Sequence, residues 1–279
     1  MELEHAARHT FALPLGMDDD TGLSTTAATS LSPRSDDGCD VVSTSSGGGG
    51  PSEKERTMLV FDWDDCLFPT TILRRWHQER HLIDVPLTDL RNVPGVLTEA
   101  QIALWDAAEA TAVAVVQEAQ RLGQMLVITN SQQGWVKLSC QNAFPRLWPW
   151  LQSVPLYSAR SQHETPEQSS ALAMAWANKN VPFVLPVDWQ TTWKQQAFRQ
   201  HVDDTVCKVL AFGDSSHDRV AALSLRSVVP QISVSHVLTV ACPTLERYQA
   251  QWQVLRPQFE ALLRSAEGVD MMVNMLPGK

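Results

Sequence analysis

The fold is decided by one stretch of the sequence, in which an apolar run ends abruptly in three acidic residues: Met58-Leu59-Val60-Phe61-Asp62-Trp63-Asp64-Asp65-Cys66-Leu67. Side chains two positions apart in an extended chain point the same way, so Asp62 and Asp64 are expected to project together beyond a buried strand. Packing gives no reason to place two like charges side by side, whereas a bound cation, or two carboxyl groups with different roles, does. A solvated acidic turn explains the motif equally well, and the motif alone does not choose.

The pattern recurs along the chain, where further short apolar runs are separated mostly by helical patterns. Apolar strands buried on both faces and alternating with helices indicate a parallel sheet. We therefore expect residues 57–279 to form one α/β domain, a Rossmann-like three-layer sandwich with a mainly parallel central sheet. The expected strands are 58–61, 125–128, 154–157, 208–212 and 237–241.

Helix boundaries are signalled at several places. Thr98 and Gln101 form a capping box before an apolar face that runs to Gly123. Thr192 and Gln195 match a second capping box, which would place Lys194 in a first helical turn. The interval 68–97, with a short helix expected over 71–81, is longer than an ordinary βα loop and predicts a flap, or minimal cap, at the carboxyl edge of the sheet.

Residues 1–56 differ in composition from the rest of the 279-residue chain. They hold ten acidic and four basic residues, so they carry −6 of the net charge of −9 and leave −3 for the remainder. They are rich in Ser, Thr, Asp and Gly, which predicts a disordered acidic tail because such a segment buries too little apolar surface to offset its ordering entropy.

The overall composition excludes some classes of function. The hydrophobic content of 44% suits a globular protein, and no basic face indicates nucleic acid or an anionic membrane as partner. Five scattered cysteines without a CxxC motif imply no disulfide framework. No secretory signal is expected at the N-terminus, so we expect the protein in the cytoplasm, with the nucleus an open alternative.

Polar side chains follow three of the expected strands, at the edge where ligands bind to open parallel sheets. Acidic groups from distant segments at one edge suit a hard cation with oxygen ligands, most naturally Mg²⁺. A threonine hydroxyl, the backbone N–H groups at a helix start and a lysine can hold an anionic oxygen. The residues concerned are Asp62, Asp64, Thr129, Asn130, Lys194, Asp214 and Asp218.

These residues resemble the haloacid dehalogenase superfamily in its phosphatase-type branch. Asp62-Trp63-Asp64-Asp65-Cys66 resembles its first motif, DxDx(T/V), and Gly213-Asp214-Ser215-Ser216-His217-Asp218 its fourth, GDxxxD. Thr129 resembles the second motif and Lys194 the third, and the resemblance covers about 57–245. The chain departs at Asp65, expected to cap backbone N–H groups, and at Cys66, expected to be a buried inert thiol.

The resemblance implies a Mg²⁺-dependent phosphatase in which Asp62 is the nucleophile and forms an aspartyl-phosphate. Asp64 would protonate the leaving oxygen and then activate water. The implied metal ligands are Asp62, the backbone carbonyl of Asp64, and Asp214, with Asp218 orienting metal-bound water. Thr129, Asn130 and Lys194 would bind the phosphoryl group.

The substrate class stays broad, as either a phosphorylated small molecule or a phosphoprotein. The oligomeric state is open. A catalytically silent protein with the same fold that binds partners, and a phosphotransferase such as a mutase, are the alternatives to a phosphatase.

Overall fold

The structure, a computed structural model, describes residues 8–13, 52–54, 56–82, 86–177, 186–229, 231–241 and 243–275. Its centre is a seven-stranded sheet in the order β1-β7-β6-β5-β2-β3-β4, and every neighbouring pair is parallel. The strands are β1 (Arg8–Leu13), β2 (Thr57–Phe61), β3 (Gln124–Thr129), β4 (Leu156–Ser158), β5 (Lys208–Gly213), β6 (Ser233–Leu238) and β7 (Asp270–Met275).

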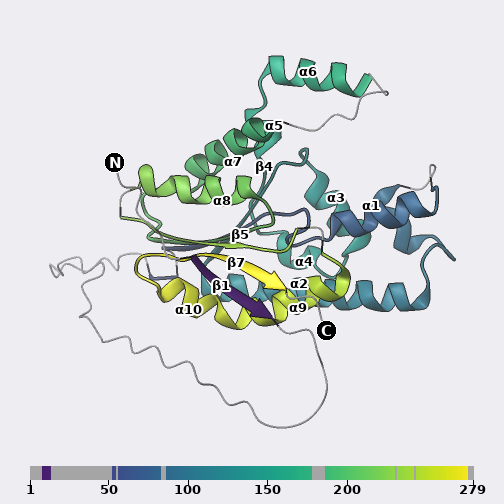
Figure 1. Cartoon of the computed structure of the whole chain (residues 1–279), viewed down its shortest axis with the longest axis horizontal. Helices are drawn as coiled ribbons and strands as arrows, with labels where there is room; N and C mark the ends of the chain where they lie inside the picture. Colours follow the sequence, from purple (N-terminus) through teal and green to yellow (C-terminus); the bar gives the residue numbers. More distant parts are fainter. Residues whose placement is uncertain are drawn as a thin grey trace, which may run out of the picture.

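Helices cover both faces of this sheet. Figure 1 shows α2, α9 and α10 on one face and α7 and α8 on the other, which confirms the expected Rossmann-like three-layer α/β sandwich. The α-helices are α1 (Thr70–Glu79), α2 (Glu99–Leu122), α3 (Trp135–Ala143), α4 (Trp148–Leu151), α5 (Ala159–His163), α6 (Pro166–Ala177), α7 (Val187–His201), α8 (Ser216–Leu223), α9 (Leu245–Leu255) and α10 (Phe259–Arg264). Short 3₁₀ helices are η1 (Leu87–Asn92), η2 (Ser224–Ser227) and η3 (Arg256–Gln258).

The alternation of side chains along β2 explains the two apolar layers. Leu59 and Phe61 belong to the core that includes α2 and α9, whereas Met58 and Val60 belong to the core beside α7 and α8. All four side chains are buried, so the strand is apolar on both faces, as parallel strands covered by helices require. The abrupt change to Asp62 therefore marks the point where the chain leaves the sheet.

Several expected boundaries are confirmed. Thr98 caps α2 in a capping box with Gln101, and the helix ends at Gly123. The helix expected over 71–81 is α1, which covers 70–79. The strands expected at 58–61, 125–128 and 208–212 are β2, β3 and β5.

Other boundaries differ from the expectation. The strand expected at 237–241 is β6, which begins four residues earlier, because buried Ser235 and His236 interrupt its apolar pattern. The strand expected at 154–157 is the three-residue β4. Polar Asp270 opens β7, which the pattern of apolar runs did not predict.

The second capping box was wrong. Helix α7 begins at Val187, so Thr192 and Gln195 lie inside it and Lys194 lies beyond its first turn. The acidic residue that suits the first turn is Asp188. Most of the expected tail, 1–56, lies outside the described residues, so its disorder stays a prediction, but Arg8–Leu13 within it forms β1, which pairs with β7 at the edge of the sheet. A composition averaged over 56 residues conceals a strand of six.

The predicted flap packs on the domain rather than standing apart from it. Ile72, Leu73 and Trp76 of α1 are buried, and Trp76 lies against Trp105 of α2 with ring centroids 5.7 Å apart. In Figure 1, α1 lies on the side of the molecule toward which the arrows of β1 and β7 point, whereas α6 stands well away from the sheet. Among the described residues no helix combines the length and apolar character needed to cross a membrane.

Candidate active site

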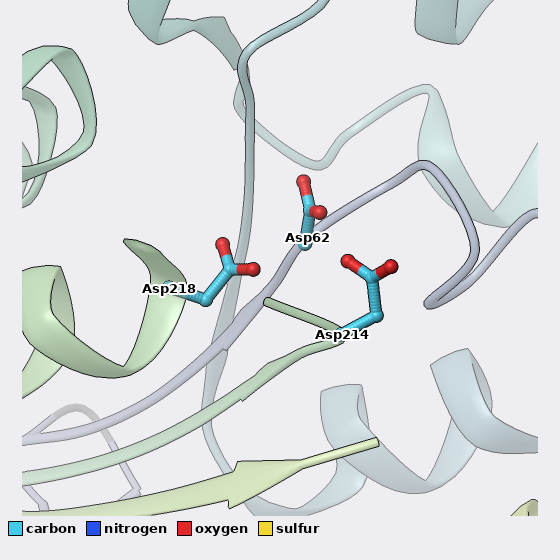
Figure 2. Close-up of side chains that lie close together, drawn as sticks. All are labelled: Asp62, Asp214 and Asp218. Carbon is cyan, nitrogen blue, oxygen red and sulfur yellow. The ribbon is translucent and has the colours of Figure 1, made fainter. Parts of the chain in front are cut away.

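Two acidic side chains stand at the carboxyl ends of adjacent central strands. Asp62 follows β2 and Asp214 follows β5. From β2 the chain continues through β3 and β4 on one side and then crosses to β5 on the other side, so the order of strands reverses between β2 and β5. Ligands of open α/β sheets bind at this kind of crevice. Figure 2 shows the carboxyl groups of Asp62 and Asp214 together with that of Asp218, which comes from α8. One carboxylate oxygen of each lies within 4.8 Å of the others.

A buried lysine completes this group. Lys194 of α7 is only 2% exposed, and its Nζ lies 2.9 Å from Oδ1 of Asp62 and in contact with Oδ1 of Asp218. A buried ammonium needs such partners, since desolvation of an unpaired charge costs several kcal/mol. We call Asp62, Lys194, Asp214 and Asp218 the Asp62 cluster. It holds three acidic groups and one basic group, and therefore lacks positive charge.

The imbalance affects the pKa of each carboxyl group. Burial raises the pKa of Asp62 well above its usual range, against the opposing effect of Lys194. Burial and the neighbouring Asp218 raise the pKa of Asp214 to about 7. Burial also acts on Asp218, but Lys194 and Ser215 outweigh it and lower its pKa. A divalent cation would relieve the repulsion that remains, and three carboxylates are the oxygen ligands that Mg²⁺ prefers.

Asp218 is fixed by its own helix as well as by Lys194. It is the third residue of a capping box, because its Oδ2 accepts from the backbone N–H of Ser215 (3.2 Å) and from Ser215 Oγ (2.5 Å). Gly213 makes room for it, since a Cβ at Gly213 would lie 2.3 Å from Cβ of Asp218. The glycine of the GDxxxD motif thus has a steric cause.

Asp64 lies two residues from Asp62 but binds different groups. Its Oδ1 accepts from Trp135 Nε1 (2.8 Å) and from Thr70 Oγ1, and its Oδ2 accepts from Ser131 Oγ (2.5 Å) and Thr129 Oγ1 (3.3 Å). We call Asp64 and these four donors the Asp64 network. Asp64 is outside the group of three carboxylates that can hold a metal ion through side chains.

The residues expected to bind phosphate are found at the ends of β3 and in α7. Thr129 is buried and accepts from the backbone N–H of Ser131 at 3.0 Å. Asn130 Nδ2 donates to the carbonyl of Gln190 in α7 at 3.3 Å. Asn130 was expected at a helix start, and this expectation was wrong. Helix α3 begins only at Trp135, after Gly134 with φ +89°. Lys194 contacts two carboxylates.

The loop between the two acids and α1 is tightly held. Asp65 accepts from the backbone N–H of Thr71 at 2.9 Å, which confirms its expected capping role. The thiol of Cys66 is buried, and burial raises its pKa well above its usual range, as expected for an inert thiol. Helix α9 fixes the loop from the other side, because Tyr248 Oη donates to the carbonyl of Leu67 at 2.7 Å. The two acids are therefore presented by a rigid segment.

Sequence reasoning missed part of the site. Thr70, Trp135 and Ser215 contact the acidic residues but stand inside or beside helices, where their types have ordinary structural explanations. Ser131 follows a strand in the predicted pattern but was given no role. A cavity of about 160 Å³ opens beside Thr129 and is lined also by Gln133, Lys137, Trp148 and Tyr157.

Comparisons of the chain with protein-family models, with curated proteins and with solved structures found no match. The family resemblance therefore stays a prediction that rests on the four sequence motifs.

Proposed function

We propose that the protein is a Mg²⁺-dependent phosphatase that hydrolyses a phosphate monoester through an aspartyl-phosphate on Asp62. The observation that carries this proposal is the Asp62 cluster, in which three carboxylates and a buried lysine meet at the carboxyl ends of the central strands. Such a cluster has no packing benefit, because burial raises the pKa of Asp62 and of Asp214. Binding of a divalent ion and a phosphoryl group would explain why these charged side chains are buried together.

The residues of the cluster fit Mg²⁺ in number and type. Asp62 and Asp214 would hold the ion through carboxylate oxygens, together with the backbone carbonyl of Asp64, and Asp218 would orient its waters. The ion, when bound, supplies positive charge that offsets the repulsion between a phosphate dianion and the acidic residues. Because both Oδ atoms of Asp218 already accept hydrogen bonds, this residue has the weakest claim as a direct ligand.

Asp62 and Asp64 have surroundings that suit different tasks. Asp62 faces Lys194, whose positive charge acts against the effect of burial, and a bound cation would act in the same direction, toward the ionised carboxylate that a nucleophile needs. Asp64 is held by neutral donors near the end of β3 and suits proton transfer to the leaving oxygen and then from water. Thr129 and Lys194 would hold phosphoryl oxygens, with Asn130 beside them.

Hydrolysis of an aryl phosphate provides the test. We expect the purified chain to release phosphate when Mg²⁺ is present and to lose this activity with a chelator. Asp62→Asn should lower kcat by about 10³-fold or more, since a covalent mechanism has no substitute for its nucleophile. Asp65→Asn is the matched control, because it neutralises an acid in the same loop that contacts α1 instead of the cluster. Equal activity of Asp62→Asn and Asp65→Asn would refute the proposal.

A further inference from the structure

Asp214 differs from the other two carboxylates of the Asp62 cluster in how it is held. Asp218 accepts from Ser215 and contacts Lys194. Asp62 is paired with the same lysine, at 2.9 Å. Asp214 has no side-chain hydrogen-bond donor among the residues that the structure describes. Carboxylates that bind metal ions are themselves held by hydrogen bonds, so a donor that orients Asp214 is expected close by.

A buried threonine lies beside Asp214 at the carboxyl edge of the sheet. Thr239 follows β6, and its backbone N–H donates to the carbonyl of Gly213 at 2.8 Å. The threonine is therefore next to the peptide group that joins Gly213 to Asp214. Its side chain is buried, and its Oγ1 has no hydrogen-bond partner within the described part of the chain.

Gln251 brings a second buried polar group to this place from α9. It is fully buried, and its Oε1 accepts from the backbone N–H of Val240, the residue after Thr239, at 3.0 Å. That bond fixes the orientation of the amide, because a backbone N–H requires an acceptor. Nε2 is thus the atom left without a partner among the described residues. An apolar side chain at either position would avoid the cost of an unpaired buried polar atom, so the two atoms point to a shared ligand.

We propose that Thr239 and Gln251 hold one water molecule that donates to the carboxylate of Asp214 and orients it toward the cation. This inference rests on the metal site of the proposed function and adds two positioning residues to it. A buried water makes about three hydrogen bonds to polar groups that have no other partner. Oγ1 of Thr239 and Nε2 of Gln251 can both donate to the water oxygen, which leaves its hydrogens for the carboxylate.

Binding of Mn²⁺ tests these residues apart from catalysis. Mn²⁺ suits the same oxygen ligands as Mg²⁺, and the electron paramagnetic resonance signal of the free ion reports how much is bound. Thr239→Val removes the hydroxyl and nearly keeps the shape of the side chain. We expect it to raise the dissociation constant of Mn²⁺ about tenfold to a hundredfold, as for loss of a group that orients a metal ligand. Thr239→Ser keeps the hydroxyl and should stay close to the wild-type value.

Thr57→Val is the matched control. Thr57 is also a buried threonine, but it lies at the start of β2, and its Oγ1 donates to the carbonyl of Glu53 at 2.8 Å. It should lower the urea midpoint of unfolding and leave the dissociation constant of Mn²⁺ unchanged. A Thr239→Val chain that binds Mn²⁺ as tightly as the wild type would overturn the inference and leave the phosphatase proposal standing. A wild-type chain that binds no Mn²⁺ would overturn the inference and the proposed metal site together.

A crystal structure of the wild-type chain with Mn²⁺ shows the water directly and does not depend on how a variant folds. We expect one ordered water within about 3.2 Å of Oγ1 of Thr239, Nε2 of Gln251 and a carboxylate oxygen of Asp214. A map that resolves other buried waters but none here, or a direct hydrogen bond between Thr239 and Gln251, would contradict the inference.

Discussion

Asp62 and Asp64 are identical side chains two positions apart, yet they lie in different surroundings. Asp62 is paired with the ammonium of Lys194 in a cluster of charges, whereas both oxygens of Asp64 accept from neutral hydroxyl and indole groups. β2 ends at Phe61, so the strand geometry that would point the two side chains the same way does not extend through Asp62 and Asp64. In the proposed mechanism, neighbouring groups rather than residue type therefore decide which acid attacks and which transfers a proton.

The largest expected effect on stability comes from a substitution that disrupts the Asp62 cluster. Lys194→Met removes the buried charge and leaves Asp62 and Asp218 without a cationic partner. We expect a loss of about 3–5 kcal/mol in the free energy of unfolding, measured by urea denaturation at pH 7. Lys208→Met is the control, because Lys208 pairs with Glu53 at the surface and such a pair is worth at most about 1 kcal/mol. Equal losses in the two variants would show that the cluster is not held by the buried ion pair.

The pH dependence of stability tests the surroundings of Asp218 from the side of β6, where His236 lies near it. His236 is fully buried in β6, and Asp270, Asp218, Arg219 and Lys194 are the charged groups near it. Burial lowers its pKa from 6.5 to about 4, although Asp218 and Asp270 act to raise it. The unfolded chain therefore binds a proton between pH 6.5 and 4 that the folded chain does not, so stability falls as pH falls through this range.

A pKa that differs by one between the folded and the unfolded chain corresponds to ~1.36 kcal/mol, so the loss of stability attributable to His236 approaches about 3 kcal/mol by pH 4. His236→Leu should reduce the difference in unfolding free energy between pH 7 and pH 4.5. An unchanged pH dependence in this variant would mean that His236 does not titrate as its burial requires.

The smallest expected effect on stability comes from a substitution in the Asp64 network. Ser131→Ala removes one donor from Oδ2 of Asp64 and leaves Thr129 at that oxygen. We expect a loss of about 1 kcal/mol in unfolding free energy, because a partly exposed carboxylate can replace the lost donor with water. Urea denaturation beside Ser216→Ala, an exposed hydroxyl at the start of α8, measures the difference. A loss as large as that of Lys194→Met would remove the contrast between the two surroundings.

The parts of this picture that a sequence can predict are those with local causes. The apolar run 58–61, which stops at Asp62, predicted β2 and the residue at which it ends. The capping box at Thr98 predicted the start of α2. Ligands bind at the carboxyl edge of parallel sheets, and this rule predicted from the sequence that Asp62, Asp214 and Asp218 lie close together, as they do. These inferences need only side-chain periodicity and the direction of strands.

The parts that failed depend on contacts between distant segments. Asp270 lies in a strand although it is polar, because Arg219 of α8 binds its carboxylate. His236 is fully buried in β6 although neither of its ring nitrogens has a hydrogen-bond partner among the described residues. The first turn of α7 was placed at Thr192 because its capping signal is local, whereas the helix begins at Val187. Trp135 has the sequence context of an ordinary helical tryptophan, so no sequence pattern identified its hydrogen bond to Asp64.

Chemical trapping tests the division of roles between the two acids most directly. In Asp64→Asn an aryl phosphate should still transfer its phosphoryl group, because its leaving group needs no proton, while hydrolysis of the acyl phosphate stalls. Reduction with borohydride and peptide mass spectrometry should then find the modification at Asp62, and the double variant Asp62→Asn with Asp64→Asn should carry none. Phosphoryl transfer to another residue, or wild-type turnover with no modification at Asp62 in the stalled variant, would contradict the proposed mechanism.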